Sequence, residues 1–348
     1  MAGITAKELA KKLNISPSAV SLALNGKPGV SEKTRTLVLE TAMQMGYTKA
    51  TPSSSFHTGK TICYIRYGGT VINAAEHTSF SSFVLRGVEA RATELGYNTQ
   101  VRYLNAGDIY NRQTMEFIRQ AAGVVFLGTD LTRNQLPEME FFFSQLDSCP
   151  VVIVDNFLLC DRVDCIGNDS LGGARSAGEY LIQQGHRRIG YVKGKQRILN
   201  FHDREQGIHT ALREAGLELA ATVEVDVSSE GAFRDFDKWL GEAKELPQGL
   251  YVENDIIAAS VIRALKYRGY RVPEDISVIG FDDIPMSEML DPPLTTVRLA
   301  KAELGTIAMD HLHHRIVHEQ VPHRMGNLHT IKTVLSTRIV SRYTVKRL

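Results

Sequence analysis

Hydrophobic positions recur at helical spacing in three short stretches near the start of the chain. The first stretch opens with residues 5–8, which have the form of a capping box. The second opens with Ser16 as N-cap and Pro17 at the first helical position, and it ends near Gly26. Ser31 is placed to cap the third. Two short helices joined by a tight turn and supported by a third are typical of a helix-turn-helix domain.

From residue 61 onward, continuous apolar and β-branched runs alternate with amphipathic stretches. Strands are predicted at 62–65, 98–104, 123–127, 151–155, 165–167, 188–192, 222–227, 250–252 and 277–281, and helices near 83–95, 174–184, 204–215, 233–243 and 256–268. This alternation favours an α/β fold with two parallel sheets, each covered by helices on both faces. Ligands bind beyond the carboxyl ends of such strands, so we expect a site between two lobes.

Charge is distributed unevenly along the chain, although the net charge is only +1. Residues 1–60 carry eight Lys or Arg against three Glu, and the remainder of the chain is mildly acidic. A small basic head on an acidic body indicates a polyanion such as DNA as the partner of the head. The alternative is a small helical domain that binds protein, or has no partner.

Several classes of protein are excluded by what the sequence lacks. No segment approaches the ~18 consecutive apolar residues of a membrane helix, and the N-terminus has no signal-peptide pattern, so we expect a cytoplasmic protein without membrane contact. The four cysteines show neither a CxxC pair nor zinc spacing, and we expect no disulfide. They are Cys63, Cys149, Cys160 and Cys165.

Enzyme chemistry and metal binding find little support. The glycine-rich run GNDSLGGARSAG has neither the G-x-G-x-x-G spacing nor a Walker lysine, and we expect no cofactor and no enzyme activity. His311, His314 and His318 share one face of a predicted helix, a spacing that can hold a transition metal. A solvated or interface face is the more common use of such a cluster, so we expect no metal.

Longer motifs identify the family. The head, with SPSAVSLALNGKPGVSEKTR and MGY, resembles the DNA-binding head of the LacI/GalR family of bacterial transcription regulators. The body segments CPVVIVDN, IGNDSLGGARSAGEYLIQQGHRRIGYV, VENDIIAASVIRALKYRGYRVPEDISVIGFDD and DPPLTTVRLAKAELG resemble its effector domain. The resemblance covers nearly the whole chain in the right order. It implies an all-α helix-turn-helix head followed by a two-lobed, periplasmic-binding-protein-like domain with parallel sheets.

The resemblance also implies which head residues touch DNA. Pro17, Ser18 and Leu22 occupy its base-reading positions. Ser16, Ser21 and Asn25 occupy positions that dock the head on phosphates. Leu22 is a departure, because many members carry Arg there. An Arg can contact guanine with two hydrogen bonds, whereas Leu offers only apolar contact, for example to a thymine methyl.

Residues 48–60 form a linker rich in Ser, Thr and Pro. In similar proteins this segment is a hinge helix that inserts a Leu into the minor groove. Phe56 stands in place of that Leu and is an acceptable wedge, but Lys49 replaces a usual Pro and Ser53-Ser54 replaces Ala-Arg. A plain flexible linker is the alternative, because consecutive serines are poor helix formers.

Effector contacts follow from the same resemblance. In the second lobe it assigns them to Arg204, Asn254 and Asp282, and in the first lobe to Ser79 and Phe80. Carboxylate, amide and guanidinium groups suit a sugar-like ligand, whose hydroxyls both donate and accept, and an aromatic face suits its ring.

A structural role is the alternative for part of this set. Asn254 and Asp282 lie where a strand is followed by a helix or a turn, so each can act as a cap. Their neighbours Asp255 and Asp283 are expected to be structural caps. The loop at 67–78, which precedes Ser79, is longer than the family pattern, and it either reaches over the cleft or is a surface excursion.

Taken together, the sequence predicts a DNA-binding transcriptional regulator, in its usual form a repressor. We expect a homodimer on a pseudo-palindromic operator, controlled by a small sugar or derivative. A sugar receptor of the periplasmic type without a DNA role is the alternative. The expected parts are a helix-turn-helix domain at 1–47, a linker or hinge at 48–60, and an effector-binding and dimerisation domain at 61–348. Within that last domain we expect a first lobe at about 61–162 and 293–323 and a second lobe at about 163–290 and 324–345.

Overall fold

The computed structural model describes most of the chain. The described residues are 6–24, 29–31, 34, 36–38, 41, 60–68, 78–146, 149–158, 163–318 and 329–348. The chain divides into two compact units, Met1–Thr58 and Gly59–Leu348, and each is considered by itself. Within the described residues, no helix has both the length and the apolar character needed to cross a bilayer.

The first unit contains the predicted pair of short helices, α1 (Ala6–Leu13) and α2 (Pro17–Leu24). Asn14 takes the left-handed backbone conformation (φ 53°) in the turn between them, and Ser16 caps α2 by accepting from the amide of Ala19 at 3.1 Å. Helical spacing brings their apolar residues together in one small core. Its buried members are Leu9, Ala10, Val20, Ala23 and Val38.

A third helical stretch follows in this unit. Ser31 accepts a hydrogen bond at 3.1 Å from the amide of Thr34, which confirms it as a cap, and residues 34, 36–38 and 41 are helical. Of the predicted capping box at 5–8, Thr5 lies outside the described residues.

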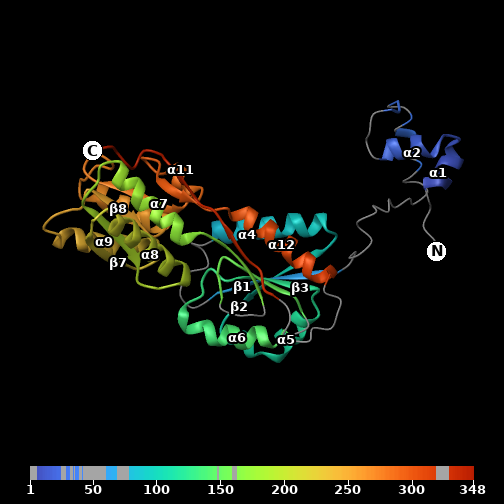
Figure 1. Ribbon diagram of the computed structural model, residues 1–348, viewed down its shortest axis with the longest axis horizontal. Helices are drawn as coiled ribbons and strands as arrows, with labels where there is room; N and C mark the ends of the chain where they lie inside the picture. The colour runs from blue at the N-terminus through green and yellow to red at the C-terminus, as the bar shows by residue number, and fades with distance from the viewer. Residues whose placement is uncertain are drawn as a thin grey trace. The chain divides into compact units, whose positions relative to one another are not determined.

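The second unit is built from two lobes, each with its own six-stranded sheet (Figure 1). In the first lobe all the strands are parallel, in the order β11-β5-β4-β3-β1-β2. These strands are β1 (Thr61–Tyr67), β2 (Asn98–Leu104), β3 (Gly123–Leu127), β4 (Val151–Val154), β5 (Asp164–Asn168) and β11 (Lys332–Leu335). Its helices are α4 (Thr78–Glu94), α5 (Arg112–Arg119), α6 (Leu136–Ser144), α12 (Lys301–His318), and the short 3-10 turns Asp108–Tyr110 and Arg133–Gln135.

The second lobe repeats this plan. Its sheet has the order β12-β10-β9-β8-β6-β7 and is parallel except at the β10–β12 edge, where the two strands are antiparallel. The strands are β6 (Ile189–Gly194), β7 (Leu219–Val225), β8 (Gly249–Val252), β9 (Ser277–Asp282), β10 (Thr295–Arg298) and β12 (Arg338–Val340). The helices are α7 (Ser170–Gln183), α8 (Leu199–Glu214), α9 (Ser229–Glu242), α10 (Asp255–Tyr267) and α11 (Met286–Met289).

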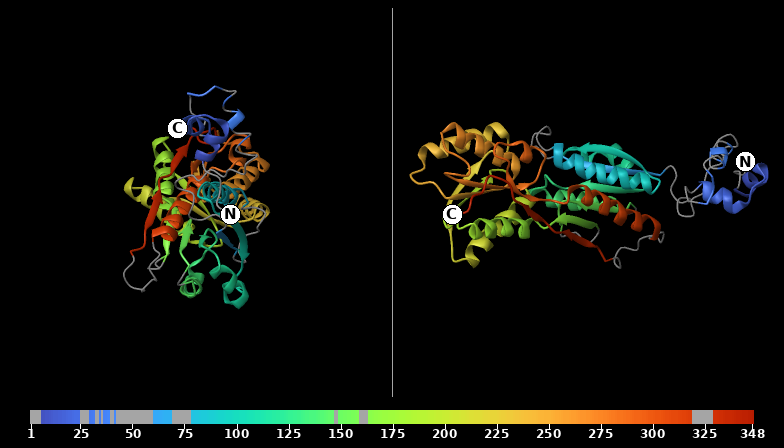
Figure 2. Two further views of the ribbon diagram at one scale, coloured as in Figure 1. Left: turned by 90° about the vertical axis from the view of Figure 1, so that its right-hand side faces the viewer. Right: turned by 90° about the horizontal axis from the view of Figure 1, so that it is seen from above.

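Both faces are buried along the central strands of each sheet, which explains the continuous apolar sequence of those strands. In β1, Ile62 and Tyr64 point to the face covered by α4 and α12, while Cys63 and Ile65 point to the face covered by α5 and α6 (Figure 1). In the second lobe, α7 and α8 cover one face and α9 and α10 the other. The two lobes, with helices on their outer faces, are seen again in Figure 2.

Two glycines let α4 and α12 cross at very short range. A Cβ atom at Gly87 would lie 2.0 Å from the main-chain oxygen of Ala302, and one at Gly305 would lie 2.1 Å from that of Val84. Neither position has room for a side chain, so the packing of the first lobe depends on both glycines.

The predicted lobe boundaries require correction. The predicted boundaries place β5 and β11 in the second lobe and β10 in the first, but β5 pairs with β4, β11 with β5, and β10 with β9. The chain therefore passes between the lobes three times, after β5, after β10 and after β11. Local sequence pattern does not reveal this exchange, because a buried parallel strand has the same composition in either sheet.

Candidate functional site

The proposed DNA-reading residues of the head form a continuous exposed surface at the start of α2. Ser16, Pro17, Ser18 and Ser21 are all exposed. Ser16 and Ser18 also hydrogen-bond to each other through their hydroxyls at 2.9 Å. A helix that presents small polar residues at its N-terminal turn can approach base edges and phosphates closely.

Leu22 lies one turn further along the same helix and is only half-buried. Its side chain is close to Gly29, where a Cβ atom would lie 3.1 Å from Leu22 Cδ1. The expected contact residues Asn25 and Phe56, like the linker residues 48–59, lie outside the described residues.

In the second unit, the three predicted polar contacts lie at the carboxyl ends of the second sheet. Arg204 comes from the first turns of α8, Asn254 follows β8 and Asp282 ends β9. The structure brings Arg204 and Asp282 together, with Nη2 and Oδ1 2.9 Å apart. The guanidinium also stacks on the ring of Phe281 at 3.9 Å and is almost fully buried.

Asn254 caps a helix, which is the structural role that its position in the sequence also allows. Its side-chain oxygen accepts from the amide of Ile257 at 2.8 Å, as the N-cap of α10, and its side chain is buried. Cap and ligand contact are not exclusive, because the amide nitrogen of a capping Asn is still a donor.

The first lobe contributes Phe80, which is buried at the start of α4 in the core that also contains Tyr64 and Val84. The structure does not describe the side chain of Ser79 or the loop residues 69–77. The contacts of Phe80 are those of a core residue.

Two residues that the sequence analysis missed complete the site. Asp155 follows β4 of the first lobe, and Asn200 stands one helical turn before Arg204 in α8. Asn200 Nδ2 donates to the main-chain oxygen of Asp155 at 3.0 Å and to its Oδ2 at 3.1 Å, and Thr129 Oγ1 donates to the same Oδ2 at 2.8 Å. The rule that polar groups gather at the carboxyl ends of parallel strands would have found Asp155.

The environment of Asp155 changes its acidity. Burial raises the pKa of this carboxyl to about 7, against the opposing effects of the Thr129 hydrogen bond and the Arg204 charge. Asp155 and Asp282 both have positive φ, 67° and 112°, which is unusual for residues with side chains. Strained backbone of this kind is concentrated at functional sites, where the surroundings hold it in place.

Main-chain contacts join the lobes beside these side chains. Ile198 forms an antiparallel bridge with Thr132, and the amide of Leu199 donates to the oxygen of Leu131 at 2.8 Å. We call this junction, together with the Asp155–Asn200 contact, the lobe seam.

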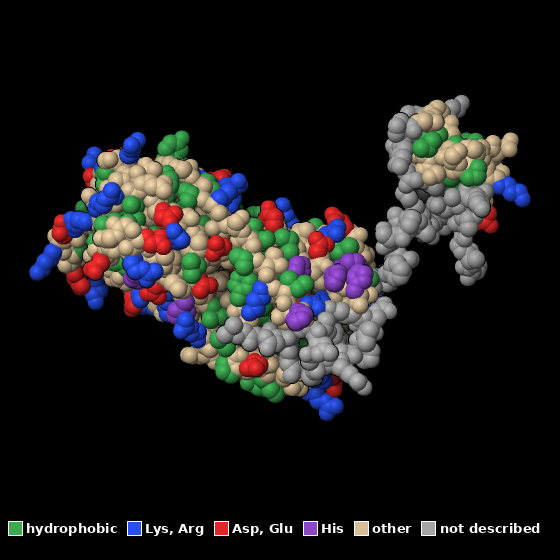
Figure 3. Space-filling model, in the orientation of Figure 1, with side chains coloured by type: hydrophobic (Ala, Val, Ile, Leu, Met, Phe, Trp, Pro, Cys, Tyr) green, Lys and Arg blue, Asp and Glu red, His purple; other side chains and the backbone are tan. Residues whose placement is uncertain are grey.

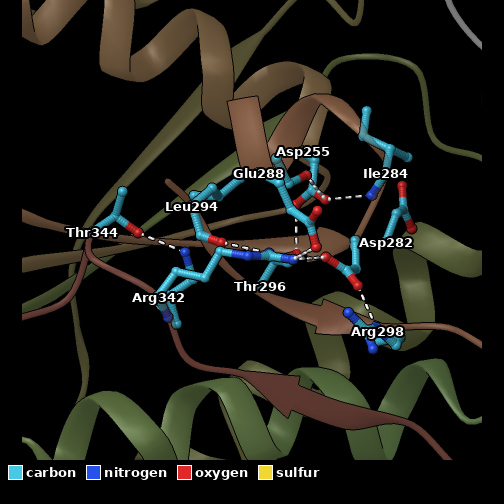
Figure 4. Close-up of polar contacts among 12 residues, drawn as sticks. Asp255, Asp282, Ile284, Glu288, Leu294, Thr296, Arg298, Arg342 and Thr344 are labelled. Carbon is cyan, nitrogen blue, oxygen red and sulfur yellow. Dashed lines mark hydrogen bonds and ion pairs between the residues drawn. The ribbon is translucent and has the colours of Figure 1, made fainter. Parts of the chain in front are cut away.

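Asp255, whose contacts are drawn in Figure 4, and Asp283 have structural roles. Neither is the helix cap that the sequence predicts, because Asn254 is the N-cap of α10 and Pro285 that of α11. Asp255 is fully buried and accepts from Ser287 Oγ and Thr296 Oγ1, each at 2.6 Å. Asp283 pairs with Arg298 and with Arg342, the latter at 2.7 Å. Burial acts to raise the pKa of Asp283, but the two guanidinium groups outweigh it and hold the pKa below its usual range.

Histidines gather over α12 (Figure 3), but they do not form a metal site of three ligands. His314 and His318 are exposed with ring centroids 4.7 Å apart, whereas His311 Nε2 lies 3.5 Å from Thr333 Oγ1. No group of three or more His, Cys, Asp or Glu in the described part of the chain is arranged to hold a metal ion.

Two family models match the chain. The model described as bacterial regulatory proteins, lacI family, matches residues 5–50, and a periplasmic binding protein-like domain matches residues 179–344. The first match covers the helix-turn-helix unit and the second covers most of the second lobe together with α12 and β11.

Curated relatives align with nearly the whole chain. An HTH-type transcriptional repressor PurR of Mannheimia succiniciproducens is 29% identical over 357 residues, 99% of each chain. The protein of the same name from Pasteurella multocida is 30% identical over 321 residues, which are 90% of this chain and 92% of the relative.

Solved structures share the fold. A lac repressor dimer bound to operator and the anti-inducer ONPF has a TM-score of 0.68 at 23% identity, over 99% of this chain and 100% of that one. A LacI family transcriptional regulator from Enterococcus faecium with bound ribose has a TM-score of 0.67 at 24% identity, over 83% and 100%. The chain therefore belongs to the lacI family of bacterial regulatory proteins, as a DNA-binding transcriptional regulator with a helix-turn-helix domain and a periplasmic-binding-protein-like effector domain.

Proposed function

We propose that this protein is a repressor whose affinity for its operator is controlled by a small polyhydroxylated effector bound at the lobe seam. The observation that carries the proposal is the gathering of Arg204, Asp282, Asp155 and Asn200 where the two lobes meet. The relatives support the output, since those from M. succiniciproducens and P. multocida are named as transcriptional repressors. A DNA-binding regulator of this kind acts in the cytoplasm, and no catalytic function is proposed.

The chemistry of the seam favours a sugar or a related compound. The Asp155 and Asp282 carboxylates can accept from ligand hydroxyls, and the Arg204 guanidinium and the Asn200 amide can donate to them. Arg204 is already paired with Asp282, so it carries little unbalanced positive charge for an anionic ligand. Among solved structures with this fold, one contains ribose and another, the regulator CelR, contains cellobiose.

For the operator, we propose that the exposed surface of α2 enters the major groove. Pro17, Ser18 and Leu22 then read bases, while Ser16 and Ser21 contact phosphates. From the family pattern we also propose that Asn25 contacts phosphates and that Phe56 inserts into the minor groove as a wedge. Because most of these contacts are to phosphate, operator affinity should fall steeply with salt.

We further propose that the protein acts as a homodimer, which presents two heads to a pseudo-palindromic operator. The second lobe carries large exposed hydrophobic side chains on neighbouring helices, Tyr267 at the end of α10 (74% exposed) and Met289 at the end of α11 (75%). Exposed apolar surface of this kind suits contact between two copies of the chain.

Effector control then follows from lobe closure. A ligand that binds one arrangement of the lobes more tightly shifts the protein toward it, and the linkers carry that shift to the heads. Coupling of this kind amounts to about 1–3 kcal/mol between sites.

A thermal-shift screen of the full chain with sugars, sugar phosphates and nucleosides tests the proposal. A ligand present at 100 times its Kd stabilises the native state by ~2.7 kcal/mol, so the melting temperature of the protein should rise. Each hit is then tested for its effect on the affinity for operator DNA selected from a random library. If no DNA sequence is selected, the proposed roles of the α2 residues in reading an operator are wrong. If DNA affinity is the same with and without every hit, effector control is wrong.

A further inference from the structure

The loop between β6 and α8, residues 195–198, is one of the parts of the second lobe that reach the first. Ile198 at its end bridges to Thr132, and Leu199 directly after it donates to Leu131. We call residues 195–198 the seam loop. Its position therefore decides whether the main-chain half of the lobe seam can form.

Arg197 anchors the seam loop inside the second lobe. Its Nη1 lies 2.7 Å from Glu253 Oε1 and 2.9 Å from Oε2, and its Nη2 donates to the Phe201 oxygen and to Glu205 Oε2, each at 2.9 Å. The planar guanidinium makes these hydrogen bonds in fixed directions, so the Arg197 side chain can shift little without breaking them.

Glu253 is the carboxylate at the centre of this arrangement. It follows β8 and is completely buried, and besides Arg197 it accepts from the amide of Gly194 at 2.7 Å and from the hydroxyl of Tyr191. Its main-chain oxygen accepts from Arg204 Nη1 at 2.7 Å. One residue thus contacts both the anchor of the seam loop and the proposed effector-binding arginine.

A buried charge pair is weak evidence of a stabilising role. Apolar side chains of similar volume often serve stability as well or better, because taking two charges out of water is costly. Burial raises the pKa of Glu253 to about 7, against the effects of Arg197, Tyr191 and Gly194. The Arg197–Glu253 pair has strict hydrogen-bond geometry, which an apolar pair lacks. It can therefore fix the position of the loop that carries Arg197.

We propose that Glu253 and Arg197 are positioning residues that hold the seam loop against the first lobe and link the state of Arg204 to the lobe seam. The first half of this inference concerns only the second unit. The second half rests on the proposed function, because it gives Arg204 its role in effector binding. A ligand that draws the guanidinium away from the Glu253 carbonyl would then loosen the segment that positions the seam loop.

Disulfide trapping measures the seam directly. Thr132 and Ile198 are paired in an antiparallel bridge, and directly opposed residues have Cβ atoms ~4.5–5.5 Å apart, so Thr132→Cys with Ile198→Cys can cross-link with small movement. The full chain with this pair is oxidised by glutathione disulfide, and the rate of bond formation is followed by mass spectrometry. Cys160 is changed to Ser throughout, while Cys63, Cys149 and Cys165 are buried and remain.

Three variants are compared in this background, Arg197→Met, Glu253→Gln and the two combined. The combined variant leaves no unpaired buried charge, so it keeps the test valid if a single variant fails to fold. The control is Arg268→Met, which breaks an equally well-formed pair with Asp237 on the surface of the same lobe. We expect the cross-linking rate to fall about tenfold in each folded variant and to stay unchanged in the control.

The outcomes separate positioning from stabilisation. A lower melting temperature with an unchanged cross-linking rate would show that the pair only stabilises the second lobe, and it would overturn the proposal. For the second half, Arg204→Met should also slow cross-linking, without any ligand or DNA present. An unchanged rate in Arg204→Met overturns the link while leaving the proposed function intact, since effector and operator binding are measured separately.

Discussion

Asn200 in the second lobe donates to Asp155 in the first lobe through a single amide nitrogen, at 3.0 Å to the main-chain oxygen and 3.1 Å to the carboxylate. The same carboxylate oxygen accepts from Thr129 within its own lobe. Asp155 is therefore held by both lobes, and any ligand that engages it competes with the contact that joins them. In the proposed mechanism, Asp155 therefore takes part both in effector binding and in the contact between the lobes.

Asp155→Asn should change how stability depends on pH. A carboxyl whose pKa is about 7 in the folded state, far above its unfolded value, contributes stability at low pH that is lost as the pH rises through 7. The groups that face it are Thr129, Asn200, Arg204, Asp282 and Asp130. The melting temperature of the variant should therefore rise relative to that of the parent between pH 5 and pH 8.

Calorimetric scans of both proteins across this range provide the measurement. A constant difference in melting temperature between the two would show that Asp155 does not titrate near neutrality. Asp275→Asn is the control: Arg271 hydrogen bonds hold the pKa of this exposed carboxyl at about 2, so its variant should show no such trend above pH 5.

Asp282→Ala should weaken effector binding and spare operator binding. The change removes an acceptor for ligand hydroxyls and leaves the buried Arg204 guanidinium without its partner, so we expect at least a tenfold rise in effector Kd. Calorimetric titration with a hit from the screen and a filter-binding assay with operator give the two readouts. Loss of both functions in a folded protein would contradict the division of labour between the units.

Ser18→Ala combined with Leu22→Arg should change operator preference. Arginine at the second position gains a two-hydrogen-bond contact to guanine, worth ~1–3 kcal/mol of discrimination, which leucine does not offer. Selection of sites from a random library, followed by sequencing, measures the preference of parent and variant. Effector affinity should stay the same, and an unchanged site would show that α2 does not read bases there.

Gly305→Ala should destabilise the first lobe, because its Cβ would lie 2.1 Å from the Val84 oxygen. Overpacking against main-chain atoms of α4 costs about 1–3 kcal/mol or more. Urea unfolding gives the free energy of unfolding. Gly68→Ala is the matched control, since no atom lies within 4 Å of its Cβ position. Equal stability of both variants would mean that α4 and α12 can separate at little cost.

Met289→Asp should weaken self-association if α10 and α11 form the contact between copies. A carboxylate in an apolar interface loses its hydration without gaining a partner. Analytical ultracentrifugation at micromolar concentration distinguishes monomer from dimer. Tyr103→Asp, at a comparably exposed aromatic position of the first lobe, is the control and should leave the dimer intact. If the Met289→Asp variant remains fully dimeric, the contact between copies does not include Met289.

Local pattern was sufficient for most strands, and the resemblance named two residues, Arg204 and Asp282, that the structure brings together. The predicted strands 123–127 and 98–104 match β3 and β2, and Arg204 and Asp282 meet as a pair. Helix starts were predicted several residues late, as at α8, which begins at Leu199 rather than near 204. In that first turn Leu199 and Asn200 contact the first lobe while Phe201 packs within the second, so the turn has no single apolar face.

Long-range pairing is what the sequence could not supply. Nothing local distinguishes β5, which completes the first sheet, from the first strand of a new one. Glu253 lies in the quoted segment VENDIIAASV, but its partner Arg197 lies 56 residues away and outside every quoted motif, so nothing local pairs the two. Such contacts depend on how two distant loops meet at the end of a sheet, which residue spacing does not record.

The three passages between lobes have a consequence for synthesis. The first lobe begins at β1, but its edge strand β11 comes from residues 332–335, almost at the end of the chain. A nascent chain on the ribosome can therefore complete neither lobe in turn, although domains usually fold as they emerge. The edge of β5 that pairs with β11 stays open while the second lobe is made as far as β10. A chain that ends anywhere before β11 lacks a strand of each sheet. Neither lobe of such a truncated chain can therefore fold completely.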